Sequence, residues 1–204
     1  MEHLRRTYCT NFKKVLDENR IIVFYDEMYF NFGSFSGYGR SLKGKRATKL
    51  FPDIRAITVK IMASICSSGF MYYTTQKTNV NRESLKKYLL RLMAVLRRKN
   101  ISGAAIIMDN AAFHKGEDIR DLIYTRGHKL LYLPPYSPFF NPIENMFAQW
   151  KGHVRSSYAK SMLELKAKIF SFNNVLTHDQ IVNYVGHASK NVQKYLDGVP
   201  ATDL

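Results

Sequence analysis

The sequence predicts an α/β fold, built on one mixed five-stranded sheet with helices on both faces. Two β-rich runs near the start of the chain are joined by a tight Ser-Ser-Gly turn, which is typical of an antiparallel hairpin. Farther along, short apolar runs alternate with helical patterns, which is typical of parallel βαβ units. A chain of 204 residues can bury a sizeable core. The two kinds of connection together predict a mixed sheet in one principal domain.

Five segments have the patterns expected of strands. Residues 21–25 and 104–108 are continuous apolar runs, which favour buried central strands ending at Asp26 and Asp109. Apolar side chains alternate along residues 55–66, so that strand should have one strongly apolar face. The expected strands are 21–25, 55–66, 70–74, 104–108 and 129–133.

Helical periodicity predicts the remaining elements. We expect residues 1–20 to form an N-terminal linker helix and residues 21–204 to form the main domain, with helices at its C-terminal end. Asn81 should cap a helix whose buried side is lined by leucines. A short helix at about 117–126 should stop at Gly127. Capping boxes mark the starts of two later helices, at Ser161/Glu164 and at Thr177/Gln180. The first helix has an apolar stripe formed by Leu4, Tyr8, Phe12, Val15 and Leu16.

A stiff loop leads into the helix that carries Glu144. Its three prolines restrict the backbone because proline fixes φ. We expect Asn141 to cap the helix and Pro142 to take the first helical position. The prolines of the loop are Pro134, Pro135 and Pro138. The helix should bury a stripe formed by Ile143, Phe147, Trp150 and Val154. A lone glutamate in a first turn is also favoured by the helix dipole alone, so Glu144 needs further support before it indicates a site.

The charge of the chain indicates a polyanionic partner. There are 31 Lys and Arg against 16 Asp and Glu, which gives a net charge of +15 and a pI near 9.8. Such an excess attracts nucleic acid or an anionic membrane, and a solvated surface is the alternative. We expect no membrane partner, because no apolar run approaches the roughly 18–20 residues of a span. Cys9 and Cys66 match no metal-ligand spacing and suggest a reducing compartment.

Two buried strands each end in an aspartate, which suggests a site at one edge of the sheet. If these strands are parallel neighbours, a spacing of about 4.8 Å places Asp26 and Asp109 side by side. The stiff loop can bring Glu144 in as a third carboxylate. Oxygen ligands without His or Cys fit Mg²⁺ or Mn²⁺, and two such ions promote phosphodiester displacement. Taken singly, Asp26 and Asp109 are equally well explained as turn residues.

Three blocks of the sequence resemble the catalytic domain of mariner-superfamily DDE transposases. FYDEMYF (24–30) and IIMDNAAFH (106–114) look like the two aspartate blocks, and LPPYSPFFNPIEN (133–145) looks like the glutamate block. Asp109 and Glu144 have 34 residues between them (144 − 109 − 1), a spacing characteristic of that superfamily. The resemblance runs in order over most of the chain.

The resemblance implies a ribonuclease-H-like fold and metal-dependent cleavage and strand transfer at transposon ends. It implies that Asp26, Asp109 and Glu144 are the catalytic residues and hold two Mg²⁺ or Mn²⁺ ions. Glu27 is the nearest rival to Asp26, and only one of the two can enter the site because adjacent strand residues face opposite ways. The implied partners are transposon-end and target DNA, and a second copy of the chain. The implied location is intracellular: the nucleus of a eukaryote, or the cytoplasm or nucleoid of a bacterium.

Other residues have more than one interpretation. Asn110, His114 and Asn141 are expected to support the site, although His114 can equally be structural. Met28 to Pro52 is interpreted as a curved hairpin with a mobile basic tip that binds DNA. Lys151 and Arg155 lie beside Glu144, where they either contact phosphate or are merely solvated. The candidate DNA-binding residues are Arg40, Lys43, Lys45, Arg46, Lys151 and Arg155.

The chain departs from the family pattern before its first strand. Relatives carry helix-turn-helix domains before the catalytic domain, whereas here only a short basic helix precedes the first strand. We therefore expect weak, salt-sensitive DNA binding without sequence preference.

Three rival functions remain open. The first rival is a domesticated or truncated transposase-derived DNA-binding protein without transposition activity. The others are a nuclease of the same fold for RNA–DNA hybrids or Holliday junctions, and a non-enzymatic basic module.

Overall fold

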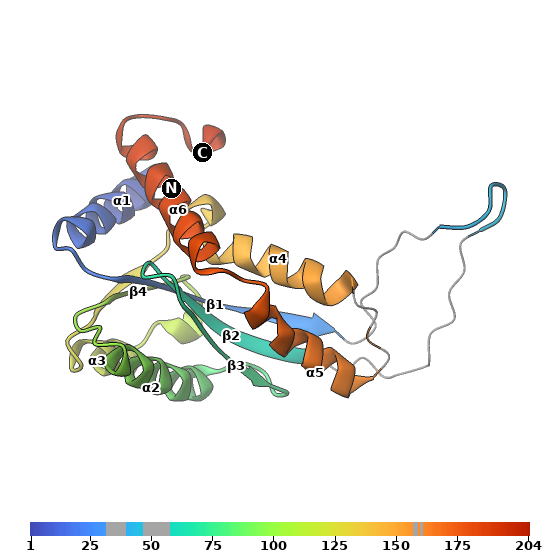
Figure 1. Ribbon diagram of the computed structural model, residues 1–204. Helices are drawn as coiled ribbons and strands as arrows, with labels where there is room; N and C mark the ends of the chain where they lie inside the picture. The colour runs from blue at the N-terminus through green and yellow to red at the C-terminus, as the bar shows by residue number, and fades with distance from the viewer. Residues whose placement is uncertain (32–39, 47–57, 157–158, 160) are drawn as a thin grey trace.

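The computed structural model describes residues 1–31, 40–46, 58–156, 159 and 161–204. Its centre is a five-stranded mixed sheet with the strand order β3-β2-β1-β4-β5 (Figure 1). The hairpin strands β1, β2 and β3 are antiparallel, while β4 and β5 run parallel to β1. The strands are β1 Ile22–Asn31, β2 Thr58–Cys66, β3 Met71–Gln76, β4 Ala105–Met108 and β5 Lys129–Tyr132. The predicted five-stranded mixed sheet is confirmed.

Strand β1 is longer than the sequence predicts. It passes through Asp26 and continues to Asn31, paired with β2 along that whole length. Its parallel pairing with β4, however, covers only Ile22–Phe24. The prediction that the strand ends at Asp26 is therefore wrong, because the antiparallel partner keeps it extended. The parallel pairing of β1 with β4 does end before Asp26, at Phe24. No residue of β4 is therefore paired with β1 beside Asp26.

Helices cover both faces of the sheet. Figure 1 shows α2 and α3 on one side, with α1, α4 and α6 on the other. The alternation along β1 divides the core accordingly: Val23 and Tyr25 pack with α2 and α3, whereas Phe24 and Met28 pack toward α1, α4 and α6. The helices are α1 Glu2–Asp17, α2 Arg82–Arg98, α3 Glu117–Tyr124, α4 Ile143–Ser156, α5 Met162–Ser171 and α6 His178–Leu196, with the short 3-10 helices η1 Ala112–His114, η2 Pro138–Phe140, η3 Phe172–Asn174 and η4 Ala201–Asp203.

Most of the predicted helix starts are confirmed. The Asn81 side chain accepts from the backbone N–H of Ser84, and reciprocal bonds join Thr177 and Gln180 at the start of α6. Ser161 accepts from Glu164 N at 3.1 Å. In α1 the buried side chains are Tyr8, Cys9, Phe12 and Val15, but Leu4 is 49% exposed and Leu16 is 41% exposed. The apolar stripe predicted for this helix is therefore wider than the face that is buried.

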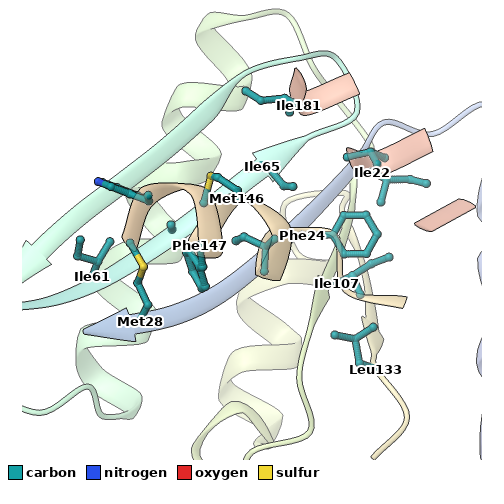
Figure 2. Close-up of a cluster of buried hydrophobic side chains, with 14 of the residues drawn as sticks. Ile22, Phe24, Met28, Ile61, Ile65, Ile107, Leu133, Met146, Phe147 and Ile181 are labelled. Atoms are coloured by element: carbon teal, nitrogen blue, oxygen red, sulfur yellow. The ribbon is translucent and has the colours of Figure 1, made fainter. Parts of the chain in front are cut away.

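Helix α4 is docked through one continuous apolar face. Ile143, Met146, Phe147 and Trp150 are buried, and Figure 2 shows Met146 and Phe147 packed over Phe24 and Met28 of β1. The Trp150 indole is fully buried and stacks on Phe172, with ring centroids 4.9 Å apart and planes 12° apart. Its Nε1 donates to the carbonyl oxygen of Ile169 at 3.2 Å. These contacts fix the helix that carries Glu144.

Part of the expected basic hairpin lies outside the described residues, namely 32–39 and 47–57. Within the described segment 40–46, Lys45 N donates to Leu42 O at 2.9 Å, which closes a turn. Among the residues that the structure describes, no helix is long and apolar enough to cross a membrane.

Candidate active site

Asp26 and Asp109 lie at the same edge of the parallel pair β1–β4. The last paired residues in the register are Phe24 and Ile107, and both aspartates come two residues later on their own segments. Because side chains alternate along a strand, both aspartates continue the face formed by Phe24 and Ile107. That face is covered by α4. The sequence therefore predicted the neighbouring placement of the two aspartates correctly, although β1 does not end there.

Asp26 is a largely buried carboxylate with two described donors. Asn141 Nδ2 donates to its Oδ2 at 2.9 Å, and the backbone N–H of Glu27 donates to its Oδ1 at 2.7 Å. Burial raises the pKa of Asp26 to about 7, and the negative charges of Glu27, Glu144 and Asp109 add to the shift. Glu144 and Asp109 are therefore close enough for their charges to act on Asp26.

Asp109 follows β4 directly and is held by the loop that comes after it. Its Oδ1 accepts from the backbone N–H of Ala111 at 3.1 Å and contacts His114 Nδ1. Burial on its own raises the pKa of Asp109, but the bonds from His114 and Ala111 outweigh it and leave the pKa below its usual value. This carboxylate is thus ionised at neutral pH while it remains 47% exposed.

Glu144 lies in the first turn of α4 and its side chain is exposed. Asn141 was expected to cap this helix, and that prediction is wrong for its side chain. The Asn141 amide instead turns to Asp26, and its Oδ1 is buried without a hydrogen-bond partner among the described residues. Only the backbone oxygen of Asn141 contacts the helix start, accepting from Glu144 N at 3.3 Å. Pro142 immediately precedes α4, one residue from its expected place.

Glu27 points to the opposite face of the sheet from Asp26. Its Oε1 lies 2.8 Å from His114 Nε2, and Tyr25 OH donates to the same oxygen at 2.5 Å. Burial lowers the pKa of His114, but its bonds to Asp109 and Glu27 prevail and raise that pKa to about 10. The sequence did not reveal the part played by Glu27 and Tyr25. The signal that could have found it is their spacing of two on one strand, which puts both side chains on one face.

The remaining candidates come from several parts of the chain. Asn110 is half-buried and lines a cavity of about 350 Å³ between α1 and residues 130–135. Lys151 is half-buried on α4 and Arg155 is exposed there. The four cations of the described turn 40–46 are all exposed: Arg40, Lys43, Lys45 and Arg46. Their assignment to DNA binding stays a prediction.

The side chains of Asp26, Asp109 and Glu144 do not form a preformed metal site in this structure. Among the described residues, no group of three or more His, Cys, Asp or Glu side chains is close enough together to hold a metal ion. Their chemistry nevertheless fits a divalent cation. All the donors are carboxylate oxygens, and a cation between them would relieve the repulsion that raises the Asp26 pKa. The exposed Glu144 side chain has the freedom to turn toward such a charge.

Comparisons with known proteins give the same fold. The Mos1 transposase paired-end complex with left transposon end aligns with a TM-score of 0.78 at 18% identity, covering 96% of this chain and 61% of that chain. The Mos1 paired-end complex with Mg aligns with a TM-score of 0.75 at 21% identity, covering 97% and 61%. The catalytic domain of Mos1 mariner transposase aligns with a TM-score of 0.71 at 18% identity, covering 95% and 90%. The ribonuclease-H-like fold is thereby confirmed.

The first matched transposases are longer proteins, and this chain spans about three fifths of their length. A search of curated proteins found no match. The family comparison matches the DDE superfamily endonucleases over residues 21–166. That range holds all three acids and covers more than half of the 204 residues, and the chain therefore belongs to the DDE superfamily endonuclease family.

Proposed function

We propose that this chain is the catalytic domain of a transposase, which cuts DNA at transposon ends and joins the freed 3′-hydroxyl to target DNA. The observation that carries the proposal is the environment of Asp26. This carboxylate is largely buried, and the charges of Asp109 and Glu144 reach it from two other elements. Such an arrangement disfavours ionisation unless a cation is present. Membership of the endonuclease family supports the same conclusion.

Asp26, Asp109 and Glu144 would hold two Mg²⁺ or Mn²⁺ ions. The bound ions would stabilise charge on the attacking and leaving oxygens of a phosphodiester displacement. The chain's own residues prepare the site. Asn141 fixes one oxygen of Asp26, and His114 with the Ala111 amide fixes one oxygen of Asp109. The packed face of α4 holds the backbone of Glu144 in place.

The candidate DNA-binding cations would bind the DNA backbone. Lys151 and Arg155 follow Glu144 along α4, and the turn 40–46 adds four more cations. Contacts of this kind are made to phosphates and carry no sequence information, so binding should be weak and sensitive to salt. We propose that two copies act together on two transposon ends, as the paired-end complexes of the structural neighbours suggest.

A nicking assay tests the proposal. Supercoiled plasmid is incubated with the protein and Mn²⁺, and the wild type is compared with Asp109→Asn and Glu144→Gln. We expect both variants to lose nicking while they retain DNA binding measured in EDTA. Glu83→Gln is the matched control, because Glu83 is an exposed carboxylate on α2 that pairs with Lys87. Nicking that persists in Glu144→Gln, or DNA binding by a wild type that never nicks, would refute the proposal and favour a DNA-binding protein without transposition activity.

A further inference from the structure

His114 is fully buried between two carboxylates that come from different elements. Its Nδ1 contacts Oδ1 of Asp109, and its Nε2 lies 2.8 Å from Oε1 of Glu27. Ionised carboxylates only accept hydrogen bonds, so both ring nitrogens of His114 face acceptors. The ring therefore links the two acids as a charge-assisted bridge from the loop after β4 to the centre of β1.

Glu27 is a fixed anchor for this bridge. Tyr25 lies two residues earlier on β1, so both side chains are on the same face of the sheet. The Tyr25 hydroxyl donates to the same Oε1 that His114 contacts, at 2.5 Å. The Tyr25 ring is fully buried and meets the imidazole edge-on, with centroids 5.6 Å apart. The Glu27 carboxylate is thus held on a central strand, while its side chain is only 18% exposed.

The backbone around His114 is held as firmly as its ring. Tyr132 of β5 donates its hydroxyl to the His114 carbonyl oxygen at 2.8 Å. The Phe113 ring packs against the imidazole with centroids 4.2 Å apart. His114 Nδ1 also lies 3.2 Å from the backbone oxygen of Asp109, so the ring touches both the side chain and the main chain of that residue.

The result of these contacts is an Asp109 carboxylate with two unlike oxygens. Both described donors, the Ala111 amide and the His114 imidazole, act on Oδ1. The side chain as a whole remains 47% exposed. The donors thus orient the carboxylate through Oδ1, and no described residue donates a hydrogen bond to Oδ2.

We propose that Glu27 is a positioning residue: it anchors His114, and through His114 it holds Asp109 as a ligand that offers one oxygen to a divalent ion. This inference rests on the proposed function, because it explains how the same site is built. It also gives a role to the acid that is next to Asp26 in sequence but faces away from it. Outer partners of metal ligands orient them, and their loss typically weakens metal binding about tenfold to a hundredfold.

Metal affinity of the full chain is the direct test, measured by calorimetric titration with Mn²⁺ alone. We expect Glu27→Gln and His114→Gln each to weaken Mn²⁺ binding about tenfold or more. The double variant should bind no more weakly than His114→Gln, because both changes act through one bridge. Glu117→Gln, which removes an exposed carboxylate from the first turn of α3, should bind as the wild type does.

Controls separate this inference from the function on which it rests. Thermal unfolding shows whether Glu27→Gln folds, and its DNA binding in EDTA should be nearly unchanged. If that variant does not fold, Tyr25→Phe serves instead, because it removes a donor to Glu27 and keeps both charges; it should weaken Mn²⁺ binding severalfold. If folded Glu27→Gln binds Mn²⁺ as tightly as the wild type while Asp109→Asn binds it poorly, the inference is overturned and the proposed function stands. A wild type that binds no Mn²⁺ would overturn both.

Discussion

Asn141 and Asp26 are 115 positions apart in sequence, and the amide of the first donates to the carboxylate of the second at 2.9 Å. This bond joins the loop before α4 to the centre of the sheet. It therefore sets the position of the helix start, and with it Glu144, relative to Asp26. The bond also explains why Asn141 does not cap the helix with its side chain.

Replacing Asn141 by Ala should impair the site more than the fold. Asp26 would lose a neutral donor, whereas the buried and unpartnered Oδ1 of Asn141 would disappear. We expect Mn²⁺-dependent nicking to fall about tenfold and the free energy of unfolding to change by about 1 kcal/mol. Plasmid nicking and chemical denaturation measure the two effects. Asn145→Ala, an exposed change on the same helix, should leave both unaltered. Equal losses in the two variants would show that the Asn141 bond has no special role.

Removing the charge of Asp26 should stabilise the metal-free protein. Its folded pKa of about 7 lies above the usual 3.8, so the folded state binds more protons than the unfolded state between about pH 4 and 7. The free energy of unfolding contributed by Asp26 therefore falls as the pH rises through that window. Asp26→Asn should be more stable than the wild type at pH 8 in EDTA, by up to about 4 kcal/mol, and should lose that advantage near pH 4. Denaturation curves of both proteins at pH 8 and pH 4 measure this difference. A variant that is less stable than the wild type at pH 8 would contradict the view that the Asp26 charge destabilises the metal-free fold.

His128 should make the fold sensitive to acid. It is buried, and its Nδ1 accepts from the backbone N–H of Ala104 at 3.1 Å. Burial lowers the pKa of His128, and the charges of Arg126 and Arg20 lower it further. The unfolded state thus binds the proton more readily, and stability is lost as the pH falls below about 6.5. His128→Asn keeps an acceptor without a titrating ring, so it should lose less stability between pH 7.5 and 5. Parallel stability curves for the two proteins would exclude this role.

The turn 40–46 should contribute to DNA binding through charge alone. Lys43 and Lys45 are exposed there. Replacing both by Ala should weaken binding to duplexes of any sequence and lower the slope of log K against log salt by about 1 to 2. Binding isotherms at several salt concentrations measure that slope. The matched control replaces Lys13 and Lys14, which are exposed on α1. An equal change in the control would mean that the attraction comes from the whole surface and not from this turn.

Local patterns were sufficient to predict the strands and most helices, because burial follows periodicity wherever one face is clearly apolar. The leucine face of α2 and the buried face of α4 are examples. Leu4 and Leu16 belong to the apolar stripe of α1 and yet are exposed, since periodicity does not show how wide the covered part of a stripe is. The end of β1 was misplaced for a different reason. Acidic residues interrupt its apolar run, but the ladder to β2 holds the backbone extended through them.

The candidate site was only partly predictable. Parallel pairing and strand alternation brought Asp26 and Asp109 to one face, as the sequence indicated. The hydrogen-bond partner of the Asn141 side chain could not be predicted, because both the start of α4 and Asp26 were suitable partners. Its nitrogen could donate to Asp26, or its oxygen could accept from the helix start, and the structure has only the bond to Asp26. The Glu27–His114 contact joins residues 87 apart, and nothing in the local sequence around either one specifies it.

The packing of Trp150 has a practical consequence. It is the only tryptophan in the sequence, and it sits on the helix that carries Glu144, stacked on Phe172. Intrinsic fluorescence excited at the indole therefore reports on this single helix without any label. A spectral change on adding divalent ions or DNA would register a movement of α4 in real time, separately from the unfolding of the rest of the chain.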